Sequence, residues 1–145
     1  TYYIQKVIDA CKSMSMSKTG ALIVFAKTYE EQVFNNNGEV IDARISKRLL
    51  EAIFAKTSPI HDGAVVISEG LIRVASCILP LTENSEIPAQ LGLRHRAAVG
   101  ITEQSDAIAI IVSEETGFIS YASRGKVRTN ISLQELDRLL NKDVA

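Results

Sequence analysis

Two short, continuous runs of apolar residues constrain the fold of this chain more than any other feature. One run covers residues 21–25 (ALIVF) and the other covers residues 107–112 (AIAIIV). Each has the length of a β-strand, and neither alternates between apolar and polar residues. A strand with this pattern is buried on both of its faces. We therefore expect both runs to lie inside a sheet that is covered on each side.

Four other segments have the spacing or the capping residues of helices. Apolar residues recur at helical spacing over residues 2–18, and Gly20 is expected to end this N-terminal helix. Ser46 can cap a second helix, whose apolar side continues to about residue 54. A third helix is expected to follow Arg94, through about Thr102. Near the end of the chain, Ser132-Leu133-Gln134-Glu135 has the capping-box spacing, which predicts a last helix.

Paired strands are expected between these helices. Residues 64–68 and 71–79 are β-rich and flank a tight turn at Glu69-Gly70, as in a hairpin. Residues 118–122 are expected to return as a strand, and residues 28–39, with Asn35-Asn36-Asn37-Gly38, to form a loop. Helices thus alternate with strands, while consecutive strands also form hairpins. This pattern favours a single α/β domain of 145 residues, with a central mixed, twisted sheet flanked by helices.

The composition excludes several classes of protein. The chain is 46% apolar and 23% charged, which is ordinary for a globular protein, and its net charge of −1 argues against a duplex nucleic-acid partner. The sequence contains no run long enough to span a membrane and no signal peptide. Cys11 and Cys77 lie in apolar segments and are expected to be buried thiols. The chain begins without Met, which we interpret as a soluble fragment of a longer protein.

Asp62 lies in the first of two clusters that indicate chemistry. It is part of Pro59-Ile60-His61-Asp62-Gly63-Ala64, directly before an apolar run. Pro59 disfavours a helix just before it, and Gly63 allows a backbone conformation closed to other residues, so the carboxylate is held with limited freedom. Such a carboxylate can bind Mg²⁺ or Mn²⁺, or take a proton from an attacking hydroxyl. The alternative is an Asx-type turn, in which Asp62 bonds only to its own backbone.

Arg94-His95-Arg96 is the second cluster. Arginine presents a planar fork of donors that matches phosphate oxygens, and Gly92 with a following helix would aim free backbone amides at the same anion. Two arginines at positions i and i+2 do not share one helix face, so a common ligand requires a loop or a first helical turn. The alternative is a solvated, charged face.

Ser113-Glu114-Glu115-Thr116-Gly117 closes a strand with two hydroxyls and two carboxylates. This turn either faces solvent or supplies a second set of groups for a phosphate and a metal ion. The chain contains no Walker loop, no dinucleotide-binding glycine motif and no zinc-type spacing. His61-Asp62 is also the pair found in metal phosphohydrolases of the HD type, but Pro59 and the following strand do not fit their helical fold.

Taken in order, these segments closely resemble the bacterial diadenylate cyclase domain, and most of all its membrane-anchored CdaA type. The resemblance rests on four segments of the chain: Gly20-Ala21-Leu22-Ile23-Val24, His61-Asp62-Gly63-Ala64, Arg94-His95-Arg96-Ala97-Ala98 and Ser113-Glu114-Glu115-Thr116-Gly117. It extends from about residue 10 to residue 122. The resemblance implies a nucleotidyltransferase that joins two ATP molecules into cyclic di-AMP and releases two pyrophosphates, with two subunits meeting face to face.

The resemblance also implies a role for each site residue. Asp62 would hold Mg²⁺ or Mn²⁺ and activate the 3′-hydroxyl, and Gly63 would let the nucleotide approach the backbone. His61 and Glu115 would lie near the metal together with Asp62. Leu79 would help to wall the adenine. The remaining residues assigned to the substrate, mainly to its phosphates, are Ala64, Arg94, His95, Arg96, Ser113 and Glu114.

Two departures from the family pattern bear on ATP affinity. The family often has Thr just before the Arg-His-Arg motif, where this chain has Leu93, and many relatives carry Tyr where this chain has Ile78. A non-catalytic module that binds ATP or cyclic di-AMP is therefore the alternative to a cyclase, and a metal-dependent phosphohydrolase is a third reading. The membrane-anchored relatives carry transmembrane helices ahead of this domain. The intact protein is expected to lie at the cytoplasmic face of the bacterial membrane, through an anchor missing from this chain.

Overall fold

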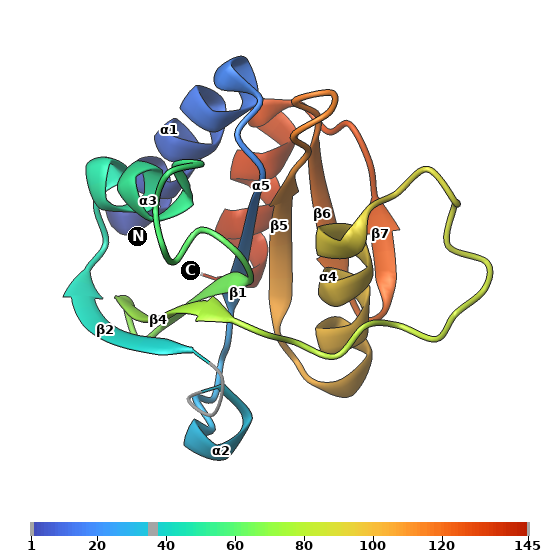
Figure 1. Cartoon of the computed structure of the whole chain (residues 1–145), viewed down its shortest axis with the longest axis horizontal. Coiled ribbons are helices and arrows are strands. Elements are labelled where there is room, and N and C mark those ends of the chain that lie inside the picture. The colour runs from blue at the N-terminus through green and yellow to red at the C-terminus, as the bar shows by residue number, and fades with distance from the viewer. Residues whose placement is uncertain (1, 35–37, 145) are drawn as a thin grey trace.

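A computed structural model of the chain describes residues 2–34 and 38–144. Within these residues the chain forms one seven-stranded sheet in the order β2-β4-β3-β1-β5-β6-β7 (Figure 1). β1 and β3 are parallel, and the other neighbouring strands are antiparallel. The predicted mixed α/β sheet is thus confirmed. Its strands are β1 (Ala21–Phe25), β2 (Glu39–Arg44), β3 (Ala64–Ser68), β4 (Leu71–Cys77), β5 (Ile108–Val112), β6 (Ile119–Ser123) and β7 (Lys126–Arg128).

Helices cover both faces of the sheet. The helices are α1 (Tyr2–Ser17), α2 (Glu31–Phe34), α3 (Lys47–Phe54), α4 (Leu93–Gln104) and α5 (Leu133–Asp143). α1, α3 and α5 pack on one face, and α4 packs on the other (Figure 1). Along β1, Ile23 faces the first helical layer, while Leu22 and Val24 face α4. Both sides of the strand are therefore apolar, which explains the two continuous apolar runs.

α1 ends in a backbone motif that the sequence did not indicate. Lys18 takes a left-handed conformation with φ of 54°, its N–H donates to Ser15 O at 3.3 Å, and the N–H of Thr19 donates to Met14 O at 2.8 Å. These two bonds form a Schellman motif with lysine in the place that glycine usually occupies. The helix therefore ends at Ser17, before Gly20, and Gly20 is free for another role.

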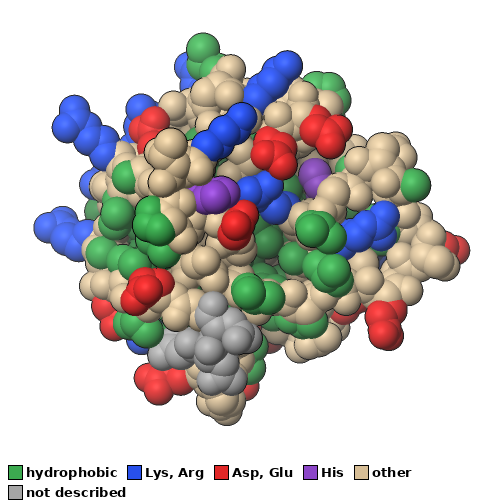
Figure 2. All heavy atoms as spheres, viewed as in Figure 1, with side chains coloured by type: hydrophobic (Ala, Val, Ile, Leu, Met, Phe, Trp, Pro, Cys, Tyr) green, Lys and Arg blue, Asp and Glu red, His purple; other side chains and the backbone are tan. Residues whose placement is uncertain are grey.

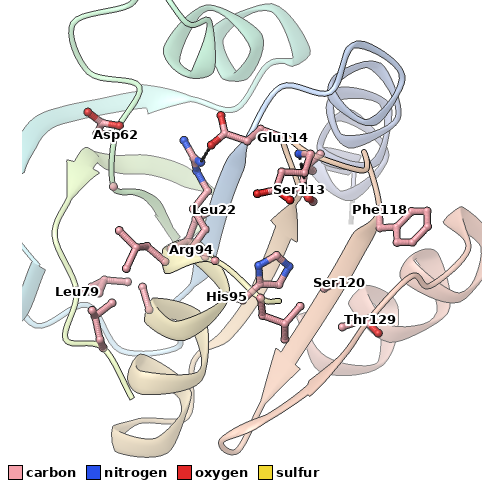
Figure 3. Close-up of a pocket in the computed structure, with 18 of the residues that line it drawn as sticks. Leu22, Asp62, Leu79, Arg94, His95, Ser113, Glu114, Phe118, Ser120 and Thr129 are labelled. Atoms are coloured by element: carbon pink, nitrogen blue, oxygen red, sulfur yellow. Dashed lines mark hydrogen bonds and ion pairs between the residues drawn. The ribbon is translucent and has the colours of Figure 1, made fainter. Parts of the chain in front are cut away.

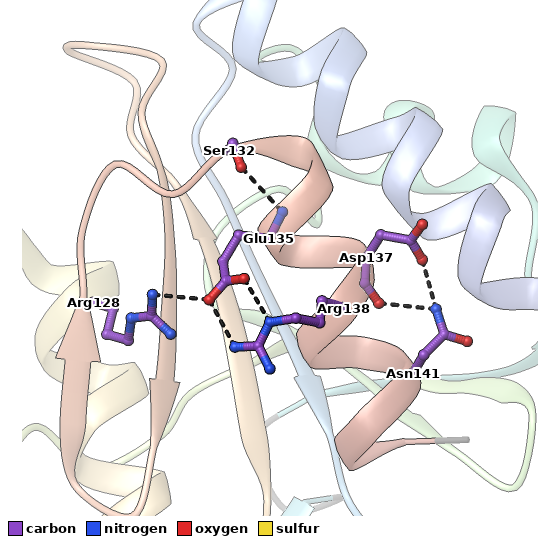
Figure 4. A network of polar contacts seen from close by, with 6 residues as sticks. All are labelled: Arg128, Ser132, Glu135, Asp137, Arg138 and Asn141. Carbon is purple, nitrogen blue, oxygen red and sulfur yellow. Dashed lines mark hydrogen bonds and ion pairs between the residues drawn. The ribbon is translucent and has the colours of Figure 1, made fainter.

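The capping residues predicted for α3 and α5 are confirmed. The Ser46 hydroxyl accepts the N–H of Leu49, and the Ser132 hydroxyl accepts the N–H of Glu135, each at 3.0 Å. In the second case the Glu135 carboxylate turns outward and accepts from Arg138 on α5 and from Arg128 on β7 (Figure 4). These arginines lower the pKa of Glu135 to about 2. The network links the last helix to the edge strand of the sheet.

The structure differs from the sequence expectations in four elements. β2 and β7 were not predicted, and the segment 28–39 contains the short helix α2 before it reaches the start of β2; Asn35, Asn36 and Asn37 lie outside the described residues. β2 contains a register shift between Val40 and Ala43, where Asp42 takes a φ of 48°. β4 ends at Cys77, two residues before the expected end of the hairpin.

Both thiols are buried, as predicted. Burial raises the pKa of Cys11 to about 12 and that of Cys77 to about 11, so both stay protonated near neutral pH. Among the described helices, none is both long and apolar enough to cross a bilayer.

Candidate nucleotide site

A cleft of about 1030 Å³ opens at one end of the sheet. β1 and β3 begin at this end and β4 and β5 finish there, so the loops that flank them share the opening. In the space-filling view, imidazole, basic and acidic side chains gather around this hollow (Figure 2). Asp62, Arg94 and Glu114 come from three separate segments and all line the cleft (Figure 3). The predicted convergence of the acidic and basic clusters is therefore found in the structure.

His61 and Asp62 form a pair at the mouth of the cleft. His61 Nδ1 lies 2.7 Å from Ser58 O, and because a carbonyl oxygen only accepts, Nδ1 carries the hydrogen. His61 Nε2 then faces Asp62 Oδ1 at 3.3 Å, and the Asp62 side chain is 85% exposed. A neutral imidazole and a carboxylate would present two lone pairs to each other. The arrangement therefore suits a metal ion between them.

This pair could supply two protein ligands to a divalent cation. Within the described ranges, no three His, Cys, Asp or Glu side chains lie close enough together to hold a metal ion. Glu115 lines the same cleft, but it does not complete a three-residue set with His61 and Asp62. A hard cation here would take its other ligands from water and from substrate oxygens, as Mg²⁺ commonly does.

Gly63 fixes the position of Asp62. Its φ is +81°, and a Cβ at this position would lie 2.7 Å from the carbonyl oxygen of Cys77 in β4. Only glycine fits here, because the turn approaches the neighbouring strand so closely. The next residue, Ala64, is fully buried, so its methyl group packs in the core beneath the cleft.

Arg94, His95 and Arg96 occupy the first turn of α4 and point in different directions. Arg94 reaches into the cleft, where its Nη1 lies 3.6 Å from Glu114 Oε1 (Figure 3). Arg94 Nε is buried and has no hydrogen-bond partner within the described part of the chain. Arg96 Nη2 instead donates to Pro88 O at 3.3 Å, and Arg96 itself is not among the residues that line the cleft. The divergence follows from helical spacing, which separates positions i and i+2.

His95 is a neutral group in this site. The residue is 6% exposed, and its Nδ1 finds no partner among the residues that the structure describes. Burial, with a further contribution from the positive charge of Arg94, lowers the pKa of His95. The imidazole therefore supplies a neutral polar group, and the cationic charge of the cluster in the cleft comes from Arg94.

Ser113 has a hydrogen to donate into the cleft. Its hydroxyl oxygen accepts the N–H groups of Glu115 and Thr116, each at 3.2 Å. The N–H of Gly117 also donates to Ser113 O at 2.9 Å, which closes the turn. Because the hydroxyl oxygen is engaged as an acceptor, its hydrogen remains available to an anion. Ser113 and the N-terminal amides of α4 are thus donors on the same cleft as Arg94.

Several wall residues were missed by the sequence analysis. Leu79 was predicted and lines the apolar part of the cleft, but Leu22, Phe118, Ser120 and Thr129 were not singled out. Ser120 is fully buried, and its hydroxyl oxygen has no partner within the described residues. A serine near the start of a mostly buried strand was the available signal, but the direction of its side chain depends on the register of β6, which the sequence does not give.

Comparison with known proteins identifies a family. The family model DAC, described as DisA bacterial checkpoint controller nucleotide-binding, matches residues 8–127. The chain is 40% identical over 140 residues to "Diadenylate cyclase CdaS" of Bacillus thuringiensis, covering 89% of this chain and 70% of that protein. It is 37% identical over 140 residues to "Cyclic di-AMP synthase CdaA" of Bacillus subtilis, covering 97% of this chain and 51% of the relative. The chain thus spans about half the length of CdaA.

Solved structures give the same result for the fold. A double mutant of DacA from Staphylococcus aureus matches with a TM-score of 0.94 and 44% identity, covering 98% of this chain and 95% of the other. A chain from Bacillus cereus, described as a hypothetical membrane spanning protein, matches with a TM-score of 0.83 and 40% identity. That match covers 88% of this chain and 63% of the other.

Proposed function

Because the chain belongs to the DAC family, we propose that it is a diadenylate cyclase, which condenses two ATP molecules into cyclic di-AMP and releases two pyrophosphates. The observation that carries the proposal is the shared cleft, which Asp62, Arg94 and the Ser113 turn all line. Phosphoryl transfer depends mainly on positioning and on neutralising charge, and this cleft offers groups for both.

The residues of the cleft suit distinct parts of the nucleotide. Leu22 and Leu79 provide an apolar wall for adenine, with Ile78 exposed beside them. Arg94, the Ser113 hydroxyl and the first amides of α4 bind phosphate oxygens. Asp62 takes the proton of the 3′-hydroxyl as that oxygen attacks the α-phosphorus of the other ATP. A bond forms between O3′ and the α-phosphorus, the α–β anhydride bond breaks, and pyrophosphate leaves; the same step then occurs in the other direction.

A divalent cation fits this assignment. His61 Nε2 and Asp62 Oδ1 are the atoms that would hold Mg²⁺ or Mn²⁺, since they face each other at 3.3 Å with a lone pair and a negative charge. When bound, such an ion offsets the charge of the attacked phosphate and lowers the pKa of the 3′-hydroxyl. Glu115 lines the same cleft, and we assign it to the water around such an ion.

The reaction requires two copies of the chain. Among the described residues, four of the exposed large apolar side chains line the cleft: Ile78, Leu81, Leu93 and Phe118. An apolar rim around a polar cleft supports face-to-face pairing, in which each copy brings one ATP to the other. Proximity of this kind can lower a barrier by roughly 7–11 kcal/mol. In the intact protein we place this domain at the cytoplasmic face of the membrane, beside an N-terminal anchor.

A product assay tests the proposal against its alternatives. The purified chain is incubated with ATP and Mn²⁺, and the products are resolved by chromatography. We expect cyclic di-AMP and pyrophosphate. ADP or AMP without a cyclic dinucleotide would instead support a phosphohydrolase. ATP that is bound but unchanged would support the non-catalytic binding module, which Leu93 favours because it is 70% exposed where the family often has a hydroxyl.

A further inference from the structure

The last residues of α1 and the segment that joins them to β1 contact both of the elements that face the phosphate part of the cleft. We refer to residues 15–20 as the α1–β1 junction. One end of the junction meets the turn that carries Ser113 and Glu114, and the other end meets the guanidinium of Arg94. The junction lies beside the cleft, and its residues are not among those that line it.

Gly20 forms the surface on which the Arg94 guanidinium rests. A Cβ built on Gly20 would lie 2.5 Å from Arg94 Nη1, 2.7 Å from Cζ and 3.2 Å from Nη2. The Arg94 side chain is 23% exposed, and its Nη1 also lies 3.6 Å from Glu114 Oε1. The guanidinium therefore contacts both a bare backbone and one carboxylate, and any side chain larger than hydrogen at position 20 would move it.

Ser15 holds the turn that follows β5. Its hydroxyl donates to Gly117 O, and a Cβ on Gly117 would lie 2.5 Å from the carbonyl oxygen of Ser15. Gly117 also has a φ of +76°, so the turn and the end of α1 fit together only with glycine at this position. Because Gly117 N–H bonds to Ser113 O, the contact passes directly to the residue that donates into the cleft.

We propose that the α1–β1 junction positions the phosphate-binding groups, with Gly20 setting the place of Arg94 and Ser15 setting the place of the Ser113–Gly117 turn. Both are positioning residues that act through others. The inference rests on the proposed function, since it assumes that the triphosphate of ATP is the ligand of Arg94 and Ser113. It adds that the end of the N-terminal helix determines how tightly ATP is held.

A double-mutant cycle tests the contact between Gly20 and Arg94. Gly20→Ala should raise KM for ATP about tenfold or more, the scale of losing one charged hydrogen bond, with a smaller change in kcat. Arg94→Ala should have a similar effect on KM. In the double variant the space around position 20 is empty, so Gly20→Ala should add no more than twofold to the effect of Arg94→Ala. Additive losses, or a single Gly20→Ala variant within twofold of the parent, would overturn the assignment.

The cycle also covers the case in which Gly20→Ala destabilises the single variant. The double variant lacks the guanidinium that the new methyl group would meet, so its melting temperature should match that of Arg94→Ala. A double variant that melts well below Arg94→Ala would show that Gly20 serves the fold independently of Arg94, which contradicts the proposal.

A serine pair on α1 tests the second contact. Ser15→Ala removes the bond to Gly117 O, and Ser13→Ala removes a serine hydroxyl bond from the same helix to the Glu51 carboxylate on α3. We expect Ser15→Ala to raise KM for ATP about two- to fivefold and Ser13→Ala to leave KM unchanged, although both melt at lower temperatures. Equal KM values for the two variants would count against the Ser15 assignment.

Failure of this inference can be told apart from failure of the proposed function. If the parent chain binds ATP but forms no cyclic di-AMP, the cyclase assignment fails, and the same variants are compared by their Kd for ATP. The Gly20 and Ser15 effects are then expected in Kd. A parent chain that neither forms product nor binds ATP would overturn both.

Discussion

At the scale of single residues, the cleft contains polar atoms with unused bonding capacity. Arg94 Nε and His95 Nδ1 are buried without partners in the described residues, and the Ser113 hydroxyl has its hydrogen free. Leaving a buried polar group unpaired costs about 1–3 kcal/mol, which the rest of the fold must offset. Unpaired groups of this kind are expected where a bound ligand would complete their hydrogen bonds. These groups all line one opening at the end of the sheet.

Asp62→Asn tests the residue assigned to proton transfer. The change is nearly isosteric, and the side chain is 85% exposed, so folding should be unaffected. We expect cyclic di-AMP formation to fall about 10²–10⁴-fold, the scale of losing a positioned acid–base group. Initial rates with saturating ATP and Mn²⁺ measure the effect, and the melting temperature serves as the control for folding. Turnover within threefold of the parent would remove Asp62 from this role.

His95 makes stability depend on pH on the mildly acidic side of neutral. Burial lowers its pKa from 6.5, so the folded chain binds this proton less tightly than the unfolded chain does. The contribution of the neutral His95 imidazole to the free energy of unfolding is therefore fully present above pH 6.5, and it is lost as the pH falls below that value. Urea unfolding between pH 5 and 8 should show this decline in the parent and a flatter profile in His95→Gln. His61→Gln, which leaves His95 in place, should retain the decline; an unchanged slope in His95→Gln would contradict the explanation.

At the scale of elements, the sequence predicted the helices and strands whose local signals agree with their packing. The caps of α3 and α5 and the two apolar strands were predicted correctly, because capping and burial leave direct traces in residue type. β2 and β7 were missed for a physical reason. β2 alternates exposed and partly buried residues around a bulge, and β7 has three residues. Each therefore forms a strand only because it pairs with a neighbour: β2 with β4, which is distant in the sequence, and β7 with β6, which directly precedes it.

The cap of α5 provides a stability test at this scale. Ser132→Ala removes the acceptor for the N–H of Glu135, which should lower the free energy of unfolding by about 1 kcal/mol. Ser132→Asp keeps an acceptor and adds a negative charge at the helix N-terminus, so it should be close to the parent. Urea denaturation of the three proteins measures the difference. Equal losses in both variants would show that the hydroxyl bond is not what stabilises this helix.

At the scale of the whole molecule, the cleft lies where two parallel strands begin. In open α/β sheets, ligands usually bind beyond the carboxyl ends of the parallel strands. Here β1 and β3 start at the cleft, while the antiparallel strands β4 and β5 end there. The mixed topology thus brings the Gly63 turn beside the Ser113 turn, which no purely parallel sheet of this order would do.

The sequence predicted which clusters would meet but not how each side chain would point. Asp62, Arg94 and Ser113 line the common cleft as expected. Arg96 turns to Pro88 and Ala64 lies in the core, because helix phase and strand register decide direction. These quantities depend on tertiary packing, so residue type and spacing alone did not reveal them.

Face-to-face pairing predicts a dependence on protein concentration. If each catalytic event needs two chains, product formation per chain should rise with concentration until the dimer is saturated, while ATP binding per chain should not change. Initial rates over a hundredfold range of protein concentration, with ATP binding measured in parallel, check this. A constant rate per chain across the whole range, together with a monomeric mass at the lowest concentration, would contradict the need for two copies.

The bulge of β2 affects how copies of the chain can meet. Edge strands tend to recruit strands from other molecules, and proteins prevent this with kinks, charges and short lengths. β2 has its register shift and the charges of Glu39, Asp42 and Arg44, and β7 offers three residues, two of them Lys126 and Arg128. Sheet extension into fibres is thereby disfavoured at both borders of the sheet, which is compatible with the proposed pairing at the end of the molecule that carries the cleft.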